Sequence, residues 1–127
     1  MKYETLTGNI VNACAAYLDR HDHTVIDMQH QTPTKVINLI AKDNEHNDLV
    51  LVNIIADKDG ESIDNCFMRS DLSNEEMRQT FEGQMMDYLA EKTDLTDISV
   101  RHDTMEVTPL DNHTMVIKHH IKAGCVC

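Results

Sequence analysis

Two apolar runs in the first half of the chain constrain its fold more than any other feature of the sequence. They cover residues 36–41 and 49–56, and the seven residues between them are all polar. Strands buried on both faces of a sheet are nearly continuous apolar runs, so the pattern predicts a hairpin of two central strands. Such a hairpin needs other elements on both faces, which favours an α/β fold.

Helical patterns flank this hairpin in the sequence. Residues 3–20 carry apolar side chains spaced by three and four, and Ser73 with Glu76 forms a capping-box pattern before a second stripe that runs to about Lys92. The two stripes are Leu6, Ile10, Cys14, Tyr17 and Leu18, and Met77, Phe81, Met85, Tyr88 and Leu89.

Shorter strands are expected around the helices, at residues 24–28, 98–107 and 115–117, and the polar residues 57–72 are expected to form a loop. The predicted order is α-β-β-β-α-β-β, an α/β three-layer sandwich on a mixed five-stranded sheet. We expect residues 1–123 to form a single domain and residues 124–127 to form a C-terminal tail.

Composition limits the classes of partner. The chain has 127 residues and a formal net charge of -11, which repels a phosphate backbone and makes nucleic-acid binding an unfavoured function. The basic cluster at residues 118–122 is too short for a nucleic-acid footprint, so a protein partner or a homodimer is the alternative. With no long apolar run and no signal-peptide pattern, we expect a cytoplasmic protein without a membrane contact, and its four scattered cysteines to form no disulfide.

One amide interrupts each of the two central runs. Asn38 and Asn53 stand among apolar residues, and burying an amide without a partner costs about 1 to 3 kcal/mol. A hairpin that folds symmetrically between Glu45 and His46 would set the two amides opposite each other. We therefore predict that they lie on one coherent face and form a hydrogen bond across the ladder.

The sequence around these amides resembles the YraN-like family of uncharacterised proteins. The likeness rests on residues 36–43 and 49–55, where the family has Gly-Glu-Ile-Asp-Leu-Ile-Ala and then Val-Phe-Val-Glu-Val-Lys. It extends to residues 15–18, to residues 101–107, which are similar to an Arg-Phe-Asp-Val-Val segment, and to residues 117–123. This resemblance implies a restriction-endonuclease-like fold related to Holliday-junction resolvases.

The resemblance also implies a site, and the site is degenerate here. The family's metal-binding Asp falls on Asn38, its Glu on Asn53 and its Lys on Ile55, while the preceding Gly-Glu falls on Lys35 and Val36. In the first helix, where members of that family often have a Glu, this chain has Asn9, Val11 and Asn12. Neutral amides do not offset the dehydration of Mg²⁺, and isoleucine performs no proton chemistry.

These replacements predict a pseudonuclease that has no catalytic residue, metal or other cofactor and acts through protein contacts. The alternatives are a divergent metal-dependent nuclease and a protein that binds nucleic acid without cleavage.

Three other groups of residues have two readings each. Cys125 and Cys127, with His113, His119 and His120, could supply zinc ligands, although their spacing is more typical of an incidental tail. The pair His21 and His23 is expected at a solvated helix end, where it could titrate near neutral pH. Cys14 is expected as a core thiol rather than a nucleophile.

Overall fold

The computed structural model describes residues 2–33, 35–58, 61–92, 99–111 and 114–121. Within them the elements follow the order α-β-β-β-β-α-β-β, which matches the predicted order except for a short additional fourth strand. The elements are α1 (Lys2–Arg20), β1 (His23–His30), β2 (Ile37–Asp43), β3 (Asp48–Lys58), β4 (Glu61–Ser62), α2 (Asn74–Glu91), β5 (Val100–Pro109) and β6 (Met115–His120).

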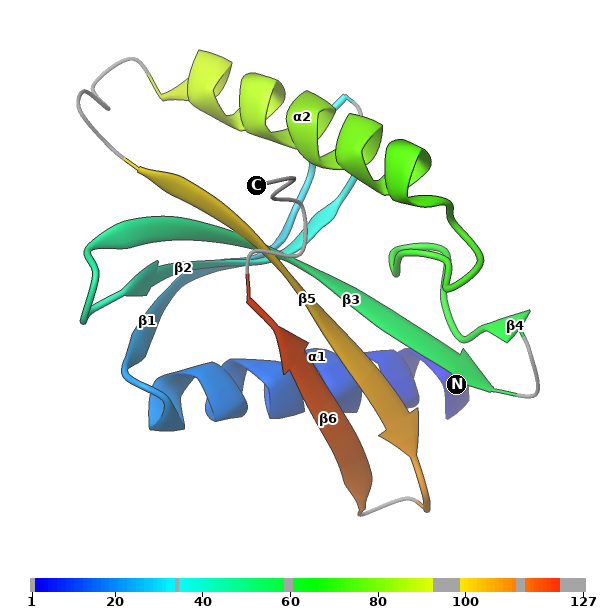
Figure 1. The fold of residues 1–127 in the computed structure, drawn as a ribbon. Coiled ribbons are helices and arrows are strands. Elements are labelled where there is room, and N and C mark those ends of the chain that lie inside the picture. The colour runs from blue at the N-terminus through cyan, green and yellow to red at the C-terminus, as the bar shows by residue number, and fades with distance from the viewer. Residues whose placement is uncertain (1, 34, 59–60, 93–98, 112–113, 122–127) are drawn as a thin grey trace.

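The sheet is mixed and lies between the two helices, α1 on one face and α2 on the other (Figure 1). Its strands follow the order β1-β2-β3-β5-β6, and β4 pairs with the end of β3. Among the described strand pairs, β3 and β5 run parallel, as expected for two strands joined by a crossover helix, and the others are antiparallel. The mixed α/β architecture predicted from the sequence is confirmed.

The central hairpin has the register that its symmetry predicts. Residue Leu39 faces Val52 and Asp43 faces Asp48, so the turn is centred between Glu45 and His46. Nearly every residue of β3 is buried, because helices cover both faces of this strand. The prediction of central strands that are apolar on both faces is therefore confirmed.

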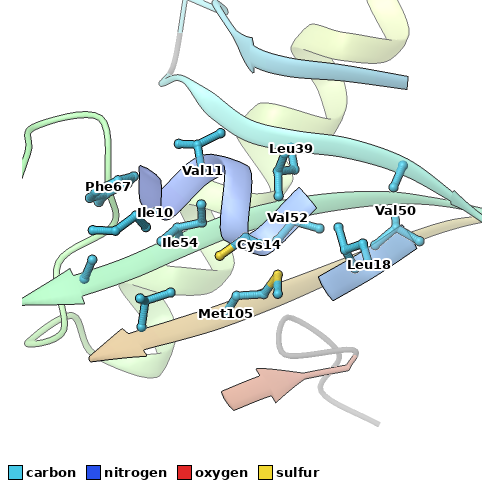
Figure 2. Close-up of a cluster of buried hydrophobic side chains, with 13 residues drawn as sticks. Ile10, Val11, Cys14, Leu18, Leu39, Val50, Val52, Ile54, Phe67 and Met105 are labelled. Atoms are coloured by element: carbon cyan, nitrogen blue, oxygen red, sulfur yellow. The ribbon is translucent and has the colours of Figure 1, made fainter. Parts of the chain in front are cut away.

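The helix α1 packs its predicted stripe onto one face of the sheet (Figure 2). Ile10, Cys14 and Leu18 are fully buried, and Leu6 and Tyr17 are partly buried against the same cluster. The buried side chains that the sheet contributes come from three strands: Leu39, Ala41, Val50, Val52, Ile54, Ala56, Met105 and Val107. Burial of these aliphatic groups is the main stabilising contribution on this face.

The helix α2 begins at the predicted capping box. The Ser73 hydroxyl accepts from the Glu76 amide, and the Glu76 carboxylate accepts from the Ser73 amide. Phe81 and Tyr88 of the predicted stripe are buried, but Leu89 is 37% exposed, so its place in the stripe was wrong. The buried position at this face belongs instead to a polar residue, Gln84.

The prediction of a loop over residues 57–72 needs correction. The strand β3 continues to Lys58, and β4 returns against it through the pairs Asp57–Ser62 and Lys58–Glu61. The segment after β4 buries Phe67 and Met68 on opposite faces of the sheet, so it closes both cores at that end. No helix within the described ranges is long and apolar enough to cross a membrane.

Candidate functional site

Asn38 lies at the beginning of β2, where it is fully buried and takes the place of a backbone group in the ladder. Its Oδ1 accepts from the Ile54 amide at 2.7 Å, and its Nδ2 donates to Gln29 Oε1 at 3.0 Å and to the Cys66 carbonyl at 2.9 Å. Regular backbone pairing between β2 and β3 begins only at Leu39, the residue that follows Asn38. The side chain therefore continues the sheet after the regular ladder has stopped.

Asn53 lies in β3 and faces α2, where it forms a reciprocal amide pair with Gln84. Asn53 Nδ2 donates to Gln84 Oε1 at 2.7 Å, and Gln84 Nε2 donates to Asn53 Oδ1 at 2.9 Å. Gln84 also donates to the Val36 carbonyl at 3.2 Å. Both side chains are essentially inaccessible, so the pair is an internal contact between sheet and helix.

The predicted hydrogen bond between Asn38 and Asn53 is wrong, although the register behind it is right. Ile37 and Ile40 are an odd number of residues apart, yet both side chains pack into the same cluster on the α2 face. The alternation of side chains between the two faces is therefore broken at the start of β2. Asn38 is drawn into the ladder by the Ile54 amide, whereas Asn53 meets an amide from the helix. The two amides therefore do not share one coherent face.

Ile55 and the positions of the first helix that the family resemblance singled out place no polar side chain beside Asn53. Ile55 packs with Met68 and Phe81 on the α2 face and is 8% exposed. In α1, Val11 belongs to the core of the opposite face, while Asn9 and Asn12 are exposed. The described side chains of α1 that pack on the sheet do so on the face opposite Asn53.

The α1 face holds a second polar group of a different kind, which we call the ionic cluster: His23, Asp43, Arg101, Asp103 and His119. At its centre the Arg101 guanidinium binds Asp43 at 2.5 Å and Asp103 through two hydrogen bonds, at 2.9 and 2.8 Å. All three residues are buried. A buried carboxylate requires such a partner, and here one cation serves two of them.

Two histidines complete the ionic cluster from the neighbouring strands. His119 Nε2 lies 2.7 Å from Asp103 Oδ2 and donates to it. His23 Nε2 lies 2.9 Å from Arg101 Nη2, which can only donate, so this ring nitrogen accepts. The other nitrogen of His23 then donates to the His21 carbonyl at 2.8 Å. Each histidine thus has a fixed orientation set by a charged neighbour.

The electrostatics of Asp43 follow from this arrangement. Burial alone would raise the pKa of Asp43, but hydrogen bonds from Arg101, from the His46 side chain and from the Glu45 and His46 amides hold that pKa below its usual range. Burial likewise opposes the charge of Arg101, and its two carboxylates nonetheless raise its pKa. The carboxylate of Asp43 therefore joins the turn of the central hairpin to β5 as a stable anion.

His102 is the one described residue with a buried side-chain polar atom that finds no hydrogen-bond partner among the described residues, its Nε2. The ring stacks on Phe81 of α2, with 5.0 Å between centroids and 23° between planes. Removal from water lowers the pKa of His102 to about 4. The imidazole is therefore neutral at physiological pH and acts as an aromatic packing group.

The described residues contain no group of three or more His, Cys, Asp and Glu side chains able to hold a metal ion. Arg101 occupies the centre of the ionic cluster, where a bound cation would otherwise neutralise Asp43 and Asp103. Cys125, Cys127 and His113, the other residues of the zinc reading, lie outside the described ranges. The Cys14 thiol is buried and its pKa rises to about 12, which fits a core thiol.

Sequence reasoning missed the ionic cluster almost entirely. His23 was expected at a solvated helix end and is instead 7% exposed, whereas its neighbour His21 is exposed as predicted. A usable signal was present in β5, because Arg101 and Asp103 lie at every second residue, on the same face as the apolar Met105 and Val107. Charges in phase with core residues indicate a buried ion pair.

The geometry on both faces is that of a structural core, with amides on one side and neutralised charges on the other. No protein-family model matches the sequence, and no curated protein matches it significantly.

Proposed function

We propose that this chain is a pseudonuclease: a restriction-endonuclease-like domain of YraN-like type that has kept its fold, lost cleavage, and acts through protein contacts. The element order and the mixed sheet between two helices agree with that fold. The family resemblance of the sequence is the second support, and the net charge of -11 is the third.

The observation that carries the proposal is the state of the positions that align with the nuclease residues. Asn38 is 0% exposed, Asn53 1% and Ile55 8%, so a nucleic-acid strand has no access to them. Both amides use their hydrogen-bonding groups inside the protein. Even a cation that accepted neutral oxygen ligands would have to displace internal hydrogen bonds to bind there.

The test is a cleavage assay with branched and single-stranded DNA, titrated with Mg²⁺ and with Mn²⁺. We expect no cleavage at any metal concentration. Cleavage that a chelator abolishes would overturn the proposal in favour of a divergent metal-dependent nuclease. Salt-dependent retention on DNA without cleavage would instead assign the chain to nucleic-acid binding.

A further inference from the structure

The two edges of the sheet differ in how well they can accept another strand. The edge strand β1 carries a register shift between Val25 and Asp27, a positive φ at Gln29, and a histidine, His30, held by Glu91 of α2 at 2.7 Å. Bulges and irregular backbone protect an edge from strand addition. The opposite edge, β6, has neither a register shift nor a positive φ among its described residues and keeps six consecutive pairs with β5.

The hydrogen bonds of the β5–β6 hairpin define which backbone groups of β6 point outward. The Leu110 amide donates to the Thr114 carbonyl at 2.8 Å, directly across the hairpin. Hydrogen-bonded pairs in an antiparallel ladder recur every second residue, so Val116, Lys118 and His120 bond inward to β5. The N–H and C=O groups of Met115, Ile117 and His119 therefore face away from the sheet.

The side chains of this edge are apolar and basic, unlike the rest of the chain. Three exposed large apolar residues belong to the hairpin: Leu110 at 62%, Val116 at 45% and Ile121 at 56%. Residues 114–121 contain no carboxylate, although the whole chain has 22. Among the described helices and strands, β6 is the one without a carboxylate, so two copies of it can lie side by side without bringing acidic side chains together.

We propose that β6 pairs with β6 of a second copy, antiparallel about a two-fold axis at Ile117, and so joins two sheets into one. The inference rests on the proposed function through protein contacts and names the partner. The outward groups of Met115, Ile117 and His119 then bond to those of His119, Ile117 and Met115 in the second copy. The interface is self-complementary, as a two-fold contact requires.

The side chains support this register over its neighbours. Between the bonded pairs, Val116 lies opposite Lys118 of the second copy, where the aliphatic part of the lysine covers the valine. A shift of two residues in the pairing, in either direction, leaves one fewer pair of outward residues in contact. One of those shifts also places Lys118 directly opposite Lys118 of the second copy, and two like charges in that position repel each other.

The test measures the dimerisation constant by sedimentation at several protein concentrations for Val116→Lys, Met28→Lys and Val116→Lys/Lys118→Glu. In the first variant, the new lysine at position 116 of each copy lies opposite Lys118 of the other copy. The interface then contains two repelling lysine pairs, and we expect dimerisation to weaken about tenfold. Met28 is the matched control, 46% exposed on the β1 edge, and its change should have no effect. The double variant opposes lysine to glutamate and should restore the dimer.

Amide hydrogen exchange in the unmodified protein gives an independent readout that needs no variant. We expect protection of the Ile117 and His119 amides to rise with protein concentration, while the Lys118 amide is protected throughout. A protein that is monomeric at all concentrations, an equal effect of Met28→Lys, or a double variant that fails to restore dimerisation would overturn the inference. None of these outcomes depends on cleavage, so failure here and failure of the pseudonuclease proposal are separate results.

Discussion

The two faces of the sheet bury polar groups by different means. The α2 face holds the uncharged pair Asn53 and Gln84, whereas the α1 face holds Arg101 between Asp43 and Asp103. Amides satisfy each other and tolerate apolar replacement in pairs, but a buried charge depends on its counter-charge. Among the described residues, this protein therefore keeps buried charge on the α1 face, opposite the face that holds the amide pair of Asn53 and Gln84.

The largest effect should follow removal of the central cation. Arg101→Leu removes the cation that neutralises the buried carboxylates of Asp43 and Asp103, and we expect the free energy of unfolding in urea to fall by about 3 to 5 kcal/mol. Arg69→Leu is the control, because Arg69 and Asp71 form an ion pair with both side chains 65% exposed. Its loss should change stability far less than the loss of Arg101 does, because solvent screens an exposed pair. Equal losses in the two variants would show that the ionic cluster is not a coupled unit.

On the α2 face the effect should be smaller and depend on whether one amide or both are removed. Asn53→Leu or Gln84→Leu alone leaves a buried amide unsatisfied, and we expect a loss of about 1 to 3 kcal/mol from the free energy of unfolding. The double variant removes both and should lose less than the sum of the two, as a double-mutant cycle in urea would show. Additive losses would contradict the reciprocal pair.

These two faces also mark how far the sequence could predict the structure. The apolar runs, the helical stripes and the capping box were sufficient for every element except β4 and for the register of the central hairpin, because local periodicity determines them. The partners of Asn38 and Asn53 could not be derived, since Gln84 and the Cys66 carbonyl are brought there by tertiary packing. The ionic cluster joins four strands, two from each half of the sequence. Its local sign was the spacing of Arg101 and Asp103, which lie two residues apart on the buried face of β5.

The smallest expected effect concerns His102, a histidine of the α2 face, and the dependence of stability on pH. On the α2 face, burial beside Phe81 lowers the pKa of His102 from 6.5 to about 4, and its Nε2 has no partner among the described residues. The unfolded chain therefore binds a proton that the folded chain excludes, so this contribution is complete above the unfolded pKa and is lost as the pH falls from 6.5 towards 4.

His102→Phe should keep the stack on Phe81 and remove this pH dependence. Over that acidic window we expect the unfolding free energy of the unmodified protein to decrease by about 1 kcal/mol per pH unit more than that of the variant. Urea unfolding at a series of pH values measures the difference, and carboxylates that titrate in the same range cancel because both proteins contain them. Parallel pH profiles would mean that His102 is protonated in the folded state, and the α2 face would then hold a buried charge as the α1 face does.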